Sequence, residues 1–136
     1  MTEVRPPAKN PCGSCPYRRD VPAGVWAEEE YAKLPPYDEE TASQPHRLFL
    51  CHQQDGSICA GWAGCHDMDS NLAARIAAAT HHIDASVHDA LLDYTTEVPL
   101  FASGAEAAAH GRSGIDSPDE KARRTIDKVK RRLTHP

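Results

Sequence analysis

The stretch FLCHQQDGSICAGWAGCHD, residues 49–67, places three cysteines and two histidines within nineteen positions. A second stretch, PCGSC at residues 11–15, adds Cys12 and Cys15 with two residues between them. This CxxC spacing lets the chain turn back so that both sulfurs reach one ion, and the free amides of the turn face the thiolates. The two stretches together predict a metal site that organises the fold of a small domain.

The other two ligands must come from the second stretch. Cys51 ends the short apolar run RLFLC, which suits a small strand, and Cys59 precedes an alanine-rich segment that is typical of a helix. Free N–H groups and the dipole at a helix N-terminus favour a thiolate there. The spacing therefore selects Cys51 and Cys59. Three residues stay open as alternative ligands or as groups that hydrogen-bond to the ligands: Cys65, His52 and His66.

Four thiolates suit either Zn²⁺ in a closed tetrahedral site or an iron–sulfur cluster such as 4Fe–4S. Pro16 after Cys15 resembles the Cys-Pro step of ferredoxins. A second family of cluster proteins, the WhiB-like proteins, has a cysteine order that this sequence does not reproduce. We favour zinc, which would be structural because a fully thiolate site leaves no position for water. Two alternatives remain: the thiols are small buried hydrophobic groups, or Cys12 and Cys15 form a redox dithiol.

Length and composition predict one domain, because 136 residues can bury a core of modest size. Five cysteines is an odd number and no secretory leader is evident, so we expect reduced thiols in the cytoplasm. No apolar run approaches the roughly 20 residues of a membrane span. The fold class that we expect is mostly α, or α+β with a minimal strand or hairpin near the cysteines.

Helices are expected at 26–34, from about 60 with a pause at 67–70, at 71–80, at 86–94, at 103–111 and at 118–133. Residues 1–10 are expected to form a flexible lead, residues 35–45 a loop, and residues 11–136 a single metal-binding domain. In the last helix, Ser117, Pro118 and Glu120 suggest a capping box. An apolar stripe then recurs at intervals of three and four: Ala122, Ile126, Val129 and Leu133.

Basic residues concentrate at the C-terminal end. Residues 112–136 carry eight basic and four acidic side chains, so this segment is +4 whereas the whole chain is −5. A basic helix can contact phosphates, although a solvated face of a docked helix is the simpler interpretation. The residues expected to contact nucleic acid are Lys121, Arg124, Lys128 and Arg131.

Several segments resemble a family of small actinobacterial and actinophage proteins that is catalogued only as a domain of unknown function. They are PCGSCPYRRDVPAGVW, LFLCHQQDGSICAGW, SNLAARIA and VPLFASGAEAAAHG, and the distinctive part is the frame CxxCP…CH…CxGW. The likeness runs from Pro11 to about Gly111. It implies that Cys12, Cys15, Cys51 and Cys59 form the cysteine set, and it implies no activity.

The hypothesis is a non-enzymatic adaptor or regulator of a host macromolecule, either a protein or a nucleic acid. The alternative is an iron–sulfur protein that senses redox state or transfers electrons. An enzyme is less favoured, because the sequence contains no phosphate-binding glycine loop, nucleophile elbow or HxE deaminase motif. The sequence leaves the partner and the oligomeric state open.

Overall fold

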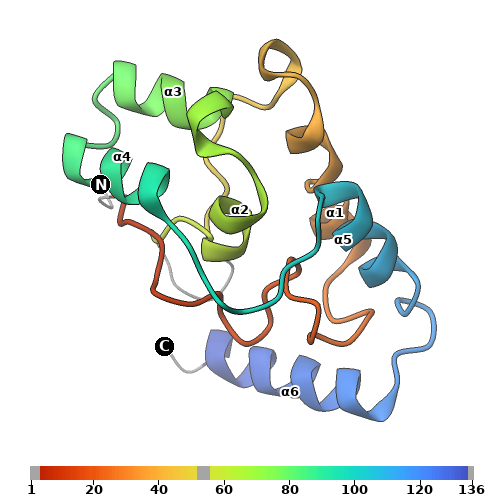
Figure 1. The fold of residues 1–136 in the computed structure, drawn as a ribbon. Coiled ribbons are helices and arrows are strands. Elements are labelled where there is room, and N and C mark those ends of the chain that lie inside the picture. The colour runs from red at the N-terminus through yellow and green to blue at the C-terminus, as the bar shows by residue number, and fades with distance from the viewer. Residues whose placement is uncertain (1–3, 52–55, 135–136) are drawn as a thin grey trace.

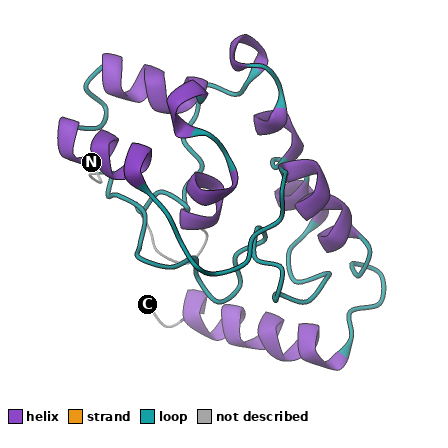
Figure 2. Ribbon diagram, in the orientation of Figure 1, coloured by secondary structure: helices purple, strands orange, loops and turns teal. Residues whose placement is uncertain are grey.

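The computed structural model describes residues 4–51 and 56–134 of the chain. Within these ranges the protein is mostly helical and contains no strand (Figures 1 and 2). The α-helices are α1 (Glu28–Tyr31), α2 (Ala60–Cys65), α3 (Leu72–Ala79), α4 (Ala85–Asp93), α5 (Gly104–Arg112) and α6 (Glu120–Thr134). The 3₁₀ helices are η1 (Pro35–Asp38), η2 (Thr41–Ser43) and η3 (Met68–Ser70). The prediction of a small, mainly helical domain is confirmed.

Polar caps fix the starts of three helices. The side chains of Asn71, Asp84 and Ser103 each accept a hydrogen bond from a backbone N–H three residues later, at 2.9–3.1 Å. Such caps satisfy donors that have no partner within the helix. The expected segments at 71–80, 86–94 and 103–111 are therefore helical. Asn71 caps α3, and Asp67 caps the preceding turn η3.

Two expectations around the prolines need correction. The helix expected at 26–34 is present but limited to Glu28–Tyr31, and the loop expected at 35–45 contains η1 and η2. Pro35 and Pro36 account for the break after the first helix and for η1. Proline has no N–H to continue the preceding helix, yet its fixed φ suits the first turn of a new one.

The strand expected at 47–51 is also absent. A single antiparallel bridge pairs Leu50 with Ile58, and the N–H groups of Cys51 and Cys59 donate to the facing segment at 2.8 Å. The pairing does not continue past Cys59, because α2 begins immediately after it. A second bridge joins Arg5 to Ser57, so the expected flexible lead contributes backbone pairing to this region.

The main core lies between α2, α3, α4 and α5, with the N-terminal turns against it. Tyr37 packs edge-on against Phe49 and Trp62, with ring centroids 6.0 and 5.5 Å apart, and Tyr17 packs against Phe49 at 5.9 Å. In Figure 1, α3 and α4 lie side by side at one end of the molecule, and α6 lies along the opposite edge.

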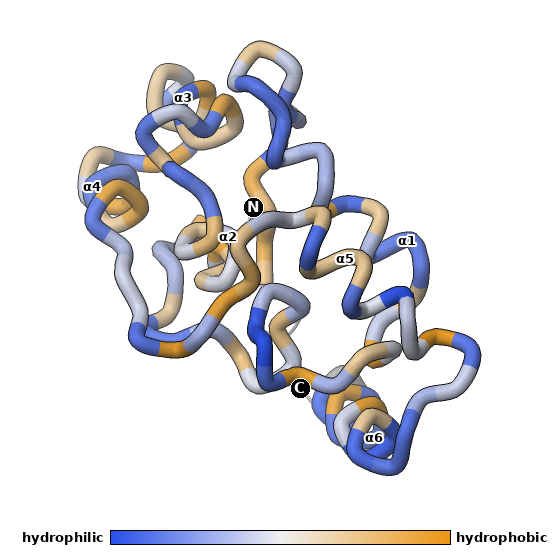
Figure 3. The backbone as a smooth tube through the Cα atoms, turned by 45° about the vertical axis from the view of Figure 1, so that its right-hand side comes forward, coloured by the Kyte–Doolittle hydropathy of each residue, from blue (hydrophilic) through white to orange (hydrophobic). Residues whose placement is uncertain are grey.

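Helix α6 docks through its apolar stripe, as expected. Ala122 and Val129 are 0% and 6% exposed, and Ala122 packs with Val21 and Val25 in a second, smaller cluster. Figure 3 shows hydrophobic and hydrophilic residues interleaved along this helix. Leu133, the last residue of the predicted stripe, belongs to α6, but its side chain is outside what the structure describes.

The start of α6 differs from the prediction. The helix begins at Glu120, and Asp119 Oδ1 accepts the hydrogen bond from the N–H of Ala122 at 2.7 Å. Asp119 therefore occupies the capping position that the sequence had suggested for Ser117. Both residue types are good caps, so the local sequence alone did not choose between them.

Candidate metal centre

The CxxC segment is folded into two consecutive turns. The N–H of Cys15 donates to the carbonyl of Cys12 at 3.0 Å, and the N–H of Arg18 donates to the carbonyl of Cys15 at 3.0 Å. The indole N–H of Trp26 donates to the carbonyl of Ser14 at 2.8 Å, and the Arg18 guanidinium donates to the carbonyl of Pro11 at 3.0 Å. These bonds hold both cysteines of the turn against the core.

The two cysteines of the second stretch come from the bridged segments. Cys51 and Cys59 flank the Leu50–Ile58 bridge, and Cys59 directly precedes α2, as the sequence predicted. Cys15 and Cys59 are buried, with 1% and 2% of their surface exposed, whereas Cys12 and Cys51 are half-buried. One pair therefore lies inside the core and the other lies at its edge.

The four predicted cysteines lie near one another. Cys15 Sγ lies 3.7 Å from Cys59 Sγ. The thiols of Cys15 and Cys51 both act on the pKa of Cys12, so these side chains are its neighbours. In this sense the four thiols form a row in the order Cys51, Cys12, Cys15, Cys59, and residues far apart in the sequence lie in one region.

The row is not a preformed coordination sphere. Within residues 4–51 and 56–134, no three or more His, Cys, Asp or Glu side chains converge as a metal-binding group. A cavity of about 10 Å³ borders Cys12 and Cys51. That volume corresponds to about one water-sized sphere.

The surroundings of Cys12 and Cys15 raise the pKa values of both thiols. The hydrogen bond with Cys15 raises the pKa of Cys12, the bond with Cys51 lowers it, and burial raises it further. For Cys15, the bond with Cys12 lowers the pKa, but the bond with Cys59, burial and the charge of Cys59 leave it well above the usual value. A cation among these sulfurs would displace their protons, because metal ligation requires the thiolate form.

Gly61 permits the close approach of Cys15 to α2. A Cβ atom at position 61 would overlap Cys15 Sγ and would lie 2.8 Å from Tyr17 Cβ. Any side chain at this position would therefore push the N-terminal turn away from the helix. The glycine in the sequence CAGW thus has a packing role beside the thiols.

The alternative ligands have different surroundings. Burial, followed by the charges of Asp38 and Glu106, raises the pKa of Cys65 to about 12, so this thiol is neutral at physiological pH. His66 Nε2 lies 3.4 Å from the Tyr17 hydroxyl, and its Nδ1 lies 3.8 Å from Asp38 Oδ1. His52 lies outside the described residues.

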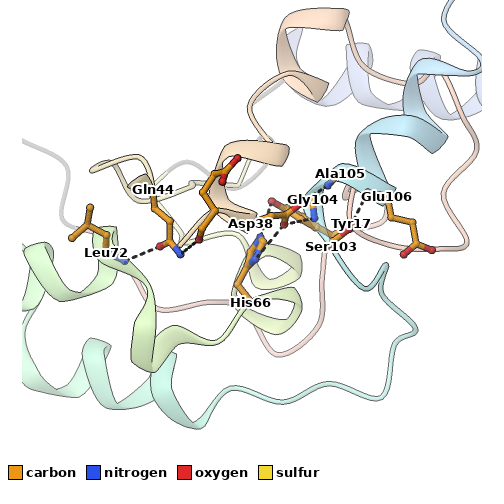
Figure 4. A network of polar contacts seen from close by, with 10 residues as sticks. Tyr17, Asp38, Gln44, His66, Leu72, Ser103, Gly104, Ala105 and Glu106 are labelled. Carbon is orange, nitrogen blue, oxygen red and sulfur yellow. Dashed lines mark hydrogen bonds and ion pairs between the residues drawn. The ribbon is translucent and has the colours of Figure 1, made fainter. Parts of the chain in front are cut away.

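Figure 4 shows the polar network around His66, which the sequence did not reveal. Asp38 accepts hydrogen bonds from the N–H groups of Gly104 and Ala105, both at 2.7 Å, and so caps α5 from a distant segment. The imidazole side chain is 9% exposed, and burial lowers the pKa of His66 although Asp38 acts in the opposite direction. Because 66 residues separate Asp38 from Gly104, no local sequence pattern indicates this cap.

The four basic residues singled out on α6 are all exposed. They are Lys121, Arg124, Lys128 and Arg131. They lie on a different element from the thiols. The thiols are buried or half-buried, whereas these four side chains lie on an open surface.

The comparisons with known proteins give a family and no function. No curated protein and no solved structure matches the chain. No helix in the described part of the chain is long and apolar enough to cross a membrane. Residues 7–131, which include both cysteine stretches and most of α6, match a family of unknown function, DUF6283. The chain therefore belongs to this family.

Proposed function

We propose that Cys12, Cys15, Cys51 and Cys59 together bind one structural Zn²⁺, and that the protein acts as a non-enzymatic adaptor or regulator of a macromolecule. The observation that carries the metal proposal is the 3.7 Å distance between Cys15 Sγ and Cys59 Sγ. In a tetrahedral site with Zn–S bonds of about 2.3 Å, neighbouring sulfurs lie about 3.8 Å apart. The buried pair already has the spacing of one edge of such a tetrahedron.

The same distance favours a single ion over a 4Fe–4S cluster. In a cubane cluster each thiolate binds its own iron, so the sulfurs of different cysteines lie farther apart than the edge of one tetrahedron. Cys12 has Cys15 and Cys51 as neighbours, so we infer that the same ion binds all four thiols. Cys12 and Cys51 lie at the edge of the core.

The proposed site would crosslink three parts of the chain. The turn at 11–18, the bridge at Leu50 and Ile58, and the start of α2 meet at the sulfurs. In the described ranges the backbone pairing near these parts consists of isolated bridges rather than a sheet. A small domain gains stability from such a crosslink, because the metal binding energy becomes folding energy.

The adaptor proposal follows from the closed character of four-thiolate sites. Zinc with four thiolates leaves no position for a substrate or an activated water molecule. All five cysteines are free. We expect a reducing compartment such as the cytoplasm. In such a compartment clustered thiols more often bind metals than form disulfides. We regard the frame CxxCP…CH…CxGW as the mark of the family and expect its members in actinobacteria and their phages.

The test is the metal content of protein purified without oxygen. We expect about one zinc per chain, no labile sulfide and no absorbance band near 400 nm, where iron–sulfur clusters absorb. Cys51→Ser and Cys59→Ser should lose the zinc and unfold at lower denaturant concentration. Cys65→Ser is the matched control and should keep the zinc. Iron and sulfide in equal amounts, or unchanged zinc in Cys59→Ser, would refute the assignment.

A further inference from the structure

We infer that α6 binds the phosphate backbone of double-stranded nucleic acid through Lys121, Arg124, Lys128 and Arg131, which we call the basic ridge. The inference names the partner of the proposed adaptor. It does not depend on which metal the thiols bind, because the ridge and the thiols lie on different elements. It rests on the orientation of α6, on its charge and on the spacing of the ridge.

Packing fixes which side of α6 faces solvent. Ala122 and Val129 are buried and Ile126 is partly buried, so these residues define the inner side of the helix. At about 100° per residue, the four residues of the basic ridge fall within an arc of about 80° on the side away from the apolar stripe. All four are exposed. The ridge is therefore a continuous outward surface and not part of the core contact.

The helix carries a charge opposite to that of the protein. Glu120–Thr134 contains seven basic and two acidic residues, which gives +5, whereas the whole chain is −5. The acidic residues Glu120 and Asp127 lie on the flank next to the basic ridge, where Arg123 and Lys130 also lie. A polyanion would consequently be attracted to α6 and repelled by the rest of the surface.

The length of the basic ridge fits a duplex backbone. Ten residues separate Lys121 from Arg131, which corresponds to about 15 Å along the helix. Along the duplex axis, one strand carries a phosphate about every 3.4 Å, so about four phosphates of a strand fall within that axial length. Long basic side chains at intervals of three or four residues can therefore contact several phosphates of the winding backbone. Such contacts position the protein without reading sequence.

Other polyanions fit less well. The sequence of α6 contains no aromatic residue, so the helix offers no platform on which the bases of a single strand could stack. An interfacial membrane helix inserts its apolar face into lipid, but the apolar side of α6 is occupied by the core contact with Val21 and Val25. The backbone of a duplex, by contrast, can bind to a helix that offers only basic side chains.

The experiment measures binding of the full chain to a fluorescent 24-base-pair DNA duplex by anisotropy, as a function of salt. The test variant carries K121Q, R124Q, K128Q and R131Q. The matched control removes the same net charge from exposed basic residues outside α6, with K9Q, K33Q, R47Q and R75Q. Circular dichroism checks that both variants keep their helices, and zinc content is measured on the same samples.

For the native chain we expect log K to fall with log[salt] at a slope of about −3 to −4, as four phosphate contacts require. The test variant should lose at least about tenfold in affinity at low salt and show a slope near zero, whereas the control should bind like the native chain. The inference is overturned if the native chain does not bind at low salt, or if both variants lose affinity equally. It is also overturned if a single strand or vesicles rich in phosphatidylserine bind as tightly as the duplex. Because zinc is measured separately, loss of binding with zinc retained leaves the metal proposal intact.

Discussion

The sulfur atoms of Cys15 and Cys59 lie 3.7 Å apart, although 44 residues separate the two cysteines in the chain. The contact joins the N-terminal turn to the residue that directly precedes α2. Both side chains are buried, and Gly61 lies next to the sulfur of Cys15. The proposed metal site therefore depends on a close approach that only a residue without a side chain allows.

The substitution Gly61→Ala tests this approach. The added methyl group overlaps Cys15 Sγ, so we expect a loss of about 1–3 kcal/mol in the free energy of unfolding, as for other overpacked cores. Zinc affinity should also fall. Gly13→Ala is the control, because a Cβ at position 13 meets no heavy atom within 4 Å. Urea unfolding and a competition assay with a zinc chelator measure both effects. Equal behaviour of the two variants would contradict the packing role of Gly61.

Asp38 should stabilise the fold without affecting the metal. It satisfies two backbone N–H groups at the start of α5, so Asp38→Ala should cost about 1–2 kcal/mol in the free energy of unfolding. Glu39→Ala, at the exposed neighbouring position, should cost much less. Zinc content should be unchanged in both variants. If Asp38→Ala lost its zinc while remaining folded, Asp38 would have to be part of the metal site.

His66 should make the protein less stable in acid. Because burial lowers its pKa below the ordinary value near 6.5, the unfolded chain takes up a proton that the folded chain resists as the pH falls. The stability is therefore fully present above about pH 6.5 and is lost as the pH falls through the lowered pKa of His66 in the folded chain. His66→Gln should show a shallower decrease of unfolding free energy over this range, measured by urea titration. His46→Gln, at an exposed position, controls for the change of residue type and should follow the native chain.

The start of α6 offers a direct comparison of two capping residues. Asp119→Ala removes the acceptor for the N–H of Ala122 and should cost about 1 kcal/mol. Ser117→Ala should change the free energy of unfolding by less than about half of that amount. Thermal unfolding followed by circular dichroism resolves the difference. A larger effect at Ser117 would show that the sequence-based capping box is the one used in solution.

Local patterns predicted the parts of the molecule that depend on neighbouring residues. The CxxC spacing of Cys12 and Cys15, the position of Cys59 before a helix and the Ser103 cap of α5 can all be seen within a few residues of sequence. The apolar stripe that docks α6 was visible for the same reason. The 3₁₀ turn at 35–38 was missed because proline both ends and starts helical turns.

Contacts between distant segments could not be predicted. The cap that Asp38 provides to α5 and the contact of Tyr17 with His66 join residues 66 and 49 positions apart, so no local spacing reports them. His66 was considered for the metal, but the partners that the structure gives it are Tyr17 and Asp38. The strand expected before Cys51 was reduced to one bridge because α2 begins directly after Cys59.

X-ray absorption at the zinc edge of the anaerobically purified protein tests the central claim most directly. We predict four sulfur neighbours at about 2.3 Å and no nitrogen or oxygen neighbour in the first coordination shell. The same spectrum should be obtained from Cys65→Ser and from His66→Gln. A first shell that contains nitrogen, or a chain that holds iron or no metal at all, would contradict the assignment of Cys12, Cys15, Cys51 and Cys59 as a single four-thiolate zinc site.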